Sequence, residues 1–269
     1  MLHPVVKDGV RIYVSPLLQS IGIPHAFSTR IGGISQRPFD SMNLGNPNGC
    51  SVQDLTPNIN ENYRRLQAAI GCERHERCYT HQVHGAEIVT VSAGHEFENN
   101  RKADALATTD PSRLLSIRVA DCVPVLLASR DGRVVAAAHA GWRGVIARVV
   151  PNAITAMQTL LPSLHPADLF AAIGPSISPD HFEVGPEVLA EFERDLHPAP
   201  VRRSDDGTDK GTVDLRGAIR QQLVGIGVPE RQIDSTDRCT YRDRDEFFSH
   251  RRDNGITGRM AALIAPAVA

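Results

Sequence analysis

Aromatic side chains are scarce in this sequence: Phe, Trp and Tyr make up 5% of the 269 residues, with one Trp. A protein that stacks nucleic-acid bases needs several exposed rings beside a basic groove. The sequence also lacks an excess of positive charge, because 29 Lys and Arg residues stand against 31 Asp and Glu residues, a formal net charge of -2. We therefore expect no nucleic-acid partner, and any anionic ligand needs a local cluster of cations.

Long apolar runs are missing as well. No stretch reaches the roughly 18 apolar residues that a membrane helix requires. The N-terminus, MLHPVVKDGV, has neither the basic start nor the apolar centre of a secretory signal. The five cysteines are odd in number and irregularly spaced, which is typical of reduced thiols. These absences predict a cytoplasmic protein that does not interact with membranes.

Strands and helices are interleaved along the chain, and no repeat or long linker divides it, so we predict one domain over residues 1–269. Apolar residues at three- and four-residue spacing predict helices at Pro57–Ile70, Val145–Leu161, Pro186–Leu196 and Leu215–Gly225. Short apolar runs predict strands at Leu114–Val119, Val123–Ser129, Val134–His139 and Leu169–Ile173. Polar, glycine-containing stretches predict loops at Thr29–Cys50 and Arg203–Gly211. The expected fold class is α+β, a mixed α/β domain.

Three short strings each place a strong metal ligand beside a break in regular structure: QVHG with His84, ADCVP with Cys122 and HAGWRG with His139. The turn at residues 130–132 predicts a hairpin that brings Cys122 and His139 to one end of a sheet. His84 joins them from a separate segment. Two imidazoles and one thiolate suit zinc, and three protein ligands leave a fourth position for catalysis.

Simpler interpretations of these residues stay open. A single His at a strand end is more often a surface residue, and a single Cys between apolar strands is more often a small buried hydrophobe. The spacing does not match a zinc finger. Cys122 could also be a nucleophile with His139 as its base. A non-enzymatic protein stabilised by a metal is a third alternative.

Arginines form a second candidate constellation, because guanidinium groups bind phosphate and carboxylate through paired hydrogen bonds. Glycines close to Arg30 and Arg143 allow a ligand to approach the backbone, which favours both as anion-binding residues. For Arg251 and Arg252 we favour a structural role, with an Arg/Asp pair in a possible edge strand.

The strings together resemble the multicopper polyphenol oxidase or laccase-domain family, whose members are also described as purine nucleoside phosphorylases and as peptidoglycan editing factors. The resemblance runs over nearly the whole chain. It rests on STR and GG at residues 28–33, MNLG at 42–45, QVHG at 82–85, ADA at 103–105, ADC at 120–122, HAGWRG at 139–144, IGP at 173–175, FEVG at 182–185, CT at 239–240, FFS at 247–249 and RRD at 251–253.

This resemblance implies that His84, Cys122 and His139 are catalytic residues that bind a metal, Zn2+ or, as the alternative, Cu2+. It also implies an α/β sandwich like that of cysteine-hydrolase-type deamidating toxins. The implied activities are phosphorolysis of adenosine, inosine and methylthioadenosine, adenosine deamination, and copper-dependent oxidation of phenols. A hydrolase that edits a peptidoglycan precursor is a further alternative.

The number of protein ligands available to metal ions lets us rank these activities. A site with one Cys and two His does not supply ligands for a set of four coppers, and the other histidines are scattered, so oxidation ranks last. Zinc with an open position suits deamination. Phosphorolysis needs an anion pocket, which the family motifs assign to Ser28, Arg30, Asn43 and Arg143. We therefore expect purine nucleosides and phosphate as the small-molecule partners.

Overall fold

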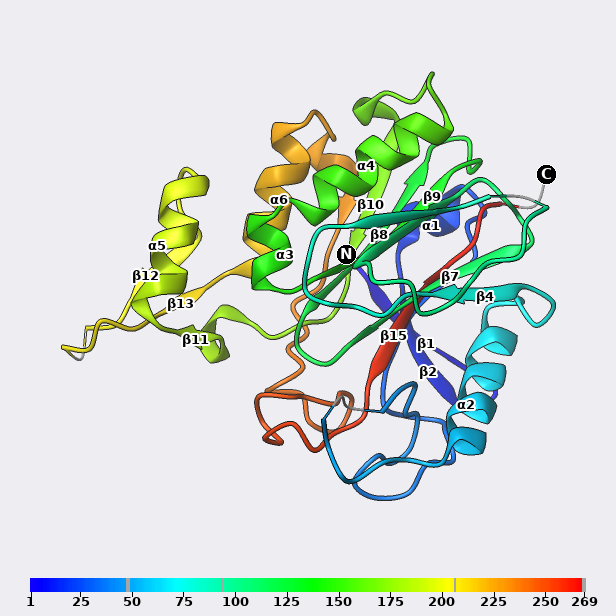
Figure 1. Ribbon diagram of the computed structural model, residues 1–269, viewed down its shortest axis with the longest axis horizontal. Coiled ribbons are helices and arrows are strands. Elements are labelled where there is room, and N and C mark those ends of the chain that lie inside the picture. The colour runs from blue at the N-terminus through cyan, green and yellow to red at the C-terminus, as the bar shows by residue number, and fades with distance from the viewer. Residues whose placement is uncertain (47–48, 93, 206, 268–269) are drawn as a thin grey trace.

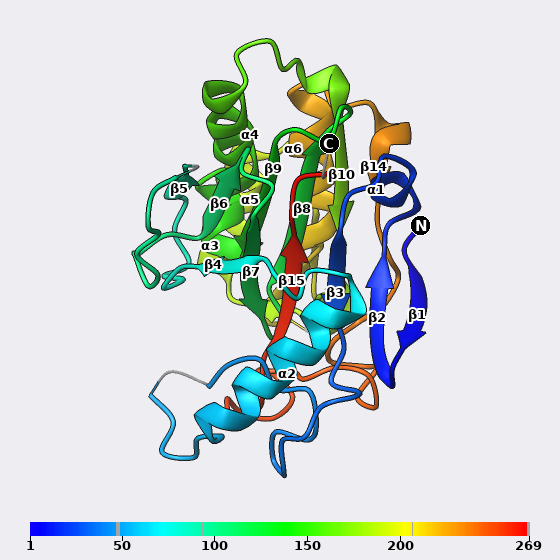
Figure 2. The same ribbon diagram turned by 90° about the vertical axis from the view of Figure 1, so that its right-hand side faces the viewer.

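The computed structural model describes residues 1–46, 49–92, 94–205 and 207–267. Two mixed sheets pack face to face, and helices cover the outer face of each (Figures 1 and 2). The predicted mixed α/β fold is confirmed. No helix in the described part of the chain is both long and apolar enough to cross a membrane.

The first sheet has six strands. In spatial order they are β1 (His3–Lys7), β2 (Val10–Val14), β3 (His25–Ser28), β15 (Met260–Ile264), β7 (Arg113–Val119) and β4 (Glu76–Tyr79). Among the described strand pairs of this first sheet, β4 and β7 run parallel and the other pairs are antiparallel. Helix α2 (Thr56–Ala69) packs Tyr63 and Leu66 against the outer face of this sheet, and the short helix α1 (Pro16–Ser20) follows β2.

The second sheet also has six strands. Their order is β14 (Ile233–Asp234), β10 (Leu169–Ile173), β8 (Val123–Ser129), β9 (Val135–Ala140), β6 (Ala105–Thr108) and β5 (Ile88–Val91). Its outer face is covered by α3 (Trp142–Ile146), α4 (Val149–Leu160) and α6 (Leu215–Gly225).

Strand β8 shows why this sheet is central to the fold, because all seven of its residues are buried. Leu126 and Ala128 face the first sheet, while Val125 and Leu127 face the helices. A strand covered on both faces needs a continuous apolar run rather than alternation. The sequence Val123–Ser129 therefore specifies an interior strand, as predicted.

A third, small sheet projects from the body in Figure 1. It consists of β11 (Glu183–Val184), β13 (Gly211–Val213) and β12 (Val201–Arg203), with α5 (Pro186–Asp195) packed against it. The loop predicted at Arg203–Gly211 is thus shorter than expected, because its two end residues pair in the β12–β13 hairpin. Residue 206 lies outside the described residues.

The helix predicted at Val145–Leu161 is wrong in its continuity. The structure has two helices, α3 and α4, separated at Arg148, whose φ of 62° is left-handed. Pro151 explains the break, because proline has no N–H for the carbonyl of Ala147 and its ring clashes with that carbonyl. Pro151 instead occupies the first turn of α4, where no donor is needed. The other predicted helices and strands are confirmed to within one residue at each end.

We expect the layer between the two sheets to dominate stability. Leu126→Ala removes a fully buried side chain from this layer, and we expect it to lower the free energy of unfolding by about 2–5 kcal/mol. Urea denaturation measures the change. Val6→Ala, at a strand position that is 65% exposed, is the control and should change stability by less than about 0.5 kcal/mol. Equal effects of both substitutions would contradict this interpretation of the core.

Candidate metal centre

A cavity of about 340 Å³ lies beside the turn that joins β7 to β8. Strand β7 of the first sheet and β9 of the second both contribute to its lining. The lining includes the three predicted metal ligands, His84, Cys122 and His139, together with Arg118, Arg251 and Arg259. Segments that are far apart in the sequence therefore combine thiol, imidazole and guanidinium groups in one cavity.

The three predicted ligands form a compact cluster. One ligand atom from each of His84, Cys122 and His139 lies within 4.8 Å of the others, the one such group found among the described residues. Cys122 directly precedes β8, and the β8–β9 register pairs Pro124 with His139. The predicted hairpin is confirmed, and it places the Cys and His side chains together at one end of the sheet.

His84 reaches the cluster from a loop that a buried carboxylate holds. Asp104 is fully buried, and its carboxylate accepts hydrogen bonds from the backbone N–H groups of Val83 (3.2 Å), His84 (2.9 Å) and Gly85 (2.7 Å). These bonds hold His84 at a φ of 60°, a left-handed conformation that is uncommon for residues other than glycine. The loop is thus shaped by hydrogen bonds rather than by a repeating secondary structure.

The same carboxylate orients the second histidine. Asp104 Oδ1 lies 2.9 Å from Nδ1 of His139, which leaves Nε2 as the ring atom available to a metal. Burial alone would raise the pKa of Asp104, but the hydrogen bonds from His139 and Gly85 outweigh burial and lower it. An ionised carboxylate on the far nitrogen of a metal-binding histidine fixes the ring and raises its basicity. Sequence reasoning quoted the ADA string but gave Asp104 no role.

The cluster carries charge in the absence of a metal. Burial disfavours the thiolate of Cys122, but His139 and His84 outweigh burial and lower its pKa to about 6. Burial likewise disfavours the charged form of His139, but Cys122 and Asp104 raise its pKa to about 9. At neutral pH the metal-free protein therefore holds a thiolate beside an imidazolium. The thiolate is the form of cysteine that binds metals and acts as a nucleophile.

The donor set fits a transition-metal ion. A thiolate and two imidazoles are the ligands that zinc and copper accept. Gly141 keeps the space between them open, since a Cβ at this position would lie 2.9 Å from Cδ2 of His84 and 3.1 Å from Sγ of Cys122. The first glycine of the HAGWRG string, Gly141, is therefore required because two potential metal ligands lie so close to its backbone.

The four residues predicted to form an anion pocket do not meet in this cavity. None of Ser28, Arg30, Asn43 and Arg143 belongs to its lining. Arg30 donates from Nε to the carbonyl of Asp40 (2.8 Å) and stacks over Phe248. Arg143 is exposed and stacks over Trp142. Their predicted role in phosphate binding stays a prediction, without support from their placement.

Ser28 and Asn43 support neighbouring backbone. The Ser28 hydroxyl accepts a hydrogen bond from the N–H of Ala261 (2.9 Å). Asn43 is fully buried, and its Oδ1 accepts from the N–H groups of Gly45 (3.2 Å) and Arg259 (2.9 Å). Asn43 thus holds the backbone of a cavity-lining arginine without facing the cavity itself.

Sequence reasoning missed Arg118 and Arg259 and assigned Arg251 to a structural role. The structure separates Arg251, which lines the cavity, from Arg252, whose Nε lies 2.9 Å from Asp253. The Arg252–Asp253 pair is confirmed, but turns rather than an edge strand carry it. One available signal was Arg118 itself, the one charged residue inside the apolar run 114–119.

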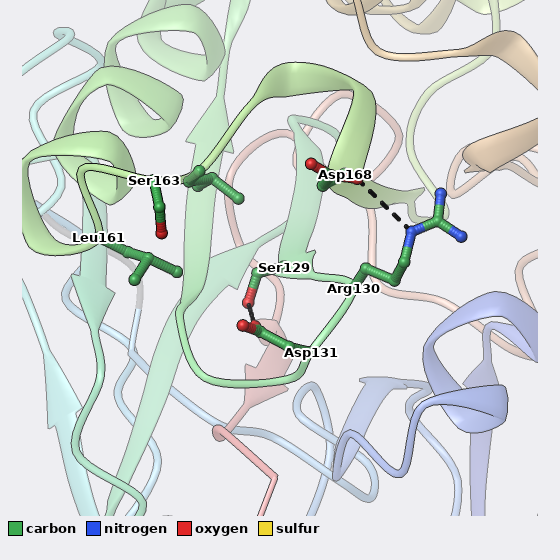
Figure 3. Close-up of a pocket in the computed structure, with 7 residues that line it drawn as sticks. Ser129, Arg130, Asp131, Leu161, Ser163 and Asp168 are labelled. Atoms are coloured by element: carbon green, nitrogen blue, oxygen red, sulfur yellow. Dashed lines mark hydrogen bonds and ion pairs between the residues drawn. The ribbon is translucent and has the colours of Figure 1, made fainter.

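A second hollow, of about 420 Å³, lies at the opposite end of β8 (Figure 3). Each of its charged groups has a partner: Arg130 lies 3.7 Å from Asp168, and Asp131 accepts a hydrogen bond from the hydroxyl of Ser129 (2.6 Å). None of the clustered metal ligands lines it. We therefore place the chemistry of the protein in the first cavity.

Comparison with known proteins shows which family and which relatives this chain is similar to. Residues 24–267 match the family described as multi-copper polyphenol oxidoreductase laccase. The chain is 39% identical over 246 residues to "Purine nucleoside phosphorylase YfiH" of Escherichia coli strain K12, covering 91% of this chain and 95% of the relative. It is 38% identical over 251 residues to "Purine nucleoside phosphorylase" of Deinococcus radiodurans, covering 93% and 92%.

A solved structure has the same fold. The crystal structure of YlmD from Geobacillus stearothermophilus matches with a TM-score of 0.85 and 32% identity, covering 98% of each chain. This match supports the mixed α/β architecture. The expected likeness to cysteine-hydrolase-type deamidating toxins stays a prediction.

The role of Asp104 gives a first prediction for the site. Asp104→Asn removes the negative charge that orients His139 and the loop of His84, so we expect metal affinity to fall roughly 10- to 100-fold. Competition with a chromogenic chelator measures this affinity. Asp168→Asn, in the exposed pair of the second hollow, should leave the affinity unchanged. An unaltered affinity in Asp104→Asn would show that this carboxylate does not support the cluster.

The lowered pKa of Cys122 predicts the pH dependence of its alkylation. The thiolate is the reactive form, and it is the major form above the pKa of about 6. In metal-free protein, iodoacetamide should therefore modify Cys122 at a nearly constant rate from pH 9 to 7, and the rate should fall as the pH drops through about 6. Mass spectrometry of the peptide follows the reaction. A midpoint near the ordinary cysteine value would contradict the proposed thiolate, and added zinc should protect the residue.

Proposed function

The chain belongs to the multi-copper polyphenol oxidoreductase laccase family, and from this premise we propose that it is a zinc-dependent purine nucleoside phosphorylase with accompanying adenosine deaminase activity. Its proposed substrates are adenosine, inosine, methylthioadenosine and phosphate, which it would meet in the cytoplasm. The products of phosphorolysis are the free base and ribose 1-phosphate or its methylthio analogue. The names of the relatives above support this assignment.

The observation that carries the proposal is the composition of the cavity. Metal ligands and three arginines face the same space. A nucleoside phosphorylase needs both a site for an anion and a polar group that acts on the sugar or base. A cavity of about 340 Å³ also lies within the range of small-molecule sites.

Ligand number argues against the chemistry in the family description. Oxygen reduction by a multicopper centre needs several coppers, each with its own ligands. The described residues contain one cluster of three potential ligands, His84, Cys122 and His139. Copper-dependent oxidation of phenols therefore stays the lower-ranked alternative, and the mixed N/S donor set favours one zinc ion with an open coordination position.

In this proposal one group of residues binds the metal and another group binds phosphate. His84, Cys122 and His139 would hold the metal, and Asp104 keeps the His139 ring in place. When bound, the metal supplies Lewis-acid polarisation and lowers the pKa of water, which suits both base departure and deamination. Cationic side chains of the cavity hold phosphate against the sugar, so the reacting groups are already oriented.

Phosphorolysis balances without a further co-reactant. A phosphate oxygen forms a bond to C1′ of the sugar, the C1′–N9 bond breaks, and its electron pair leaves with the purine. The purine takes up the proton that the attacking phosphate loses. His250 lines the cavity, and burial together with the nearby Arg259 lowers its pKa, so its neutral ring can donate a hydrogen bond to the departing base.

A thiol hydrolase acting on a peptidoglycan precursor is the second candidate. The observation that favours it is the thiolate of Cys122 beside His139, the arrangement of cysteine nucleophiles. The two candidates differ in their need for metal, because a bound zinc would engage the sulfur as a ligand.

Product analysis tests the proposed function. With zinc-loaded protein, we expect adenosine and phosphate to give adenine and ribose 1-phosphate, and adenosine without phosphate to give inosine. Chromatography separates these products, and metal analysis of the same samples measures zinc. Cys122→Ala should abolish both metal binding and turnover, whereas Asp168→Asn should retain both. If none of the three nucleosides releases its free base, the phosphorylase proposal is wrong. Cleavage of a muramyl peptide by metal-free protein would favour the hydrolase.

A further inference from the structure

Two half-buried guanidinium groups of the cavity, those of Arg118 and Arg259, have no carboxylate partner among the residues that the structure describes. In the described part of the chain, the side chain of Arg118 makes no hydrogen bond or ion pair, although it is partly buried. The guanidinium of Arg259 donates only to backbone carbonyls, those of Thr257 (3.0 Å) and Gly258 (3.1 Å). Guanidinium groups that are removed from water ordinarily pair with an anion.

Among the described residues, Asp121 is the one carboxylate that lines the cavity, and it makes no hydrogen bond to either guanidinium, although its charge partly offsets that of Arg259. Both oxygens of Asp121 are engaged, since Oδ1 accepts from the hydroxyl of Thr240 (2.6 Å) and Oδ2 from the N–H of Arg251 (2.7 Å). Burial lowers the pKa of Arg259, and the positive charge of Arg118 lowers it further. The two arginines therefore repel each other across a space in which an anion would stabilise both.

Specific contacts hold these like charges in place. Gly45 lies against the Arg118 side chain, since a Cβ on Gly45 would come within 2.8 Å of Cδ and 2.9 Å of Nη1 of the arginine. Gln82 forms two hydrogen bonds with the backbone of Arg118, one to its carbonyl (2.7 Å) and one from its N–H (2.8 Å). Asn43 fixes the backbone of Arg259 through the bond described above. Because these contacts hold two cations near each other despite their repulsion, the arrangement is typical of a preorganised anion-binding site.

We propose that Arg118 and Arg259 form the oxyanion subsite of this cavity and bind the phosphate co-substrate beside the His84–Cys122–His139 cluster. The identity of the anion rests on the proposed function, whereas the existence of the subsite rests on the two unpaired guanidinium groups. Two guanidinium forks can bind one tetrahedral phosphate through several charge-assisted hydrogen bonds. Arg251 is not included, because it is exposed whereas Arg118 and Arg259 are half-buried; its guanidinium donates to the carbonyl of Glu183 (2.9 Å) and stacks over Phe182.

Gln82 connects this subsite to the metal ligands. It lies two residues before His84 and holds the backbone of Arg118 in β7. The loop that carries a metal ligand and the strand that carries a phosphate ligand are therefore joined directly. This connection keeps the anion and the metal at a fixed separation, which an in-line attack on the sugar requires.

Steady-state kinetics of the zinc-loaded enzyme with inorganic phosphate tests the proposal. We expect Arg118→Gln and Arg259→Gln each to raise the KM for phosphate roughly 10- to 100-fold, the usual loss for a charge-assisted hydrogen bond. The KM for adenosine should rise much less than the KM for phosphate, and the zinc content should stay that of the wild type. Arg133→Gln, at an exposed pair with Asp131 far along the sheet, is the matched control for loss of one arginine.

Lysine variants and calorimetry separate the possible outcomes. Arg118→Lys and Arg259→Lys keep the charge but lose the fork, so each should give a KM for phosphate between those of the wild type and the Gln variant even if the Gln variant folds poorly. If wild-type protein phosphorolyses adenosine and both Gln variants keep its KM for phosphate, or if Arg143→Gln raises it instead, the subsite proposal is overturned and the proposed function stands. If wild-type protein releases no base but calorimetry shows phosphate binding that both Gln variants lose, the subsite stands and the proposed function fails.

Discussion

The buried carboxylate of Asp104 is the interaction on which the site depends. One side chain accepts three backbone hydrogen bonds from residues 83–85 and bonds the ring of His139. Burying a carboxylate is costly unless it is hydrogen-bonded, and here four partners offset the cost. The same four contacts join a loop and a strand that are otherwise independent, so stability and metal geometry come from a single group.

The fold places this carboxylate where two sheets come together. Strand β7 ends and β8 begins at the turn that carries Cys122, and β9 returns His139 to the same level. The His139 imidazole and the Cys122 thiolate thus converge at one end of the second sheet, while Arg118 comes from the first sheet and His84 from a loop. The potential metal ligands and the cationic side chains that we propose to bind phosphate thus come from different parts of the fold. This division suits a reaction in which a metal and a phosphate act on one small substrate.

The family description and the names of the relatives differ, and the ligand set favours the activity in the relatives' names. One cluster of two histidines and one cysteine in the described residues fits a single metal ion with an open position, not a copper set. Fold and family membership alone permit either chemistry, since unrelated functions share folds. The oxyanion subsite that we propose at Arg118 and Arg259 would add a second criterion, because oxidation of a phenol needs no such site.

The sequence by itself determined the interior strands, most helices and the β8–β9 hairpin, because these depend on local periodicity and turn residues. It therefore placed Cys122 beside His139. Family motifs, rather than spacing, brought in His84, whose loop is shaped by the distant Asp104. Only the tertiary structure decided which arginines line the cavity. The glycines beside Arg30 and Arg143 favoured those two residues, but Arg118 and Arg259 face the cavity instead. Whether a guanidinium has a partner depends on contacts between remote segments, and no local pattern encodes them.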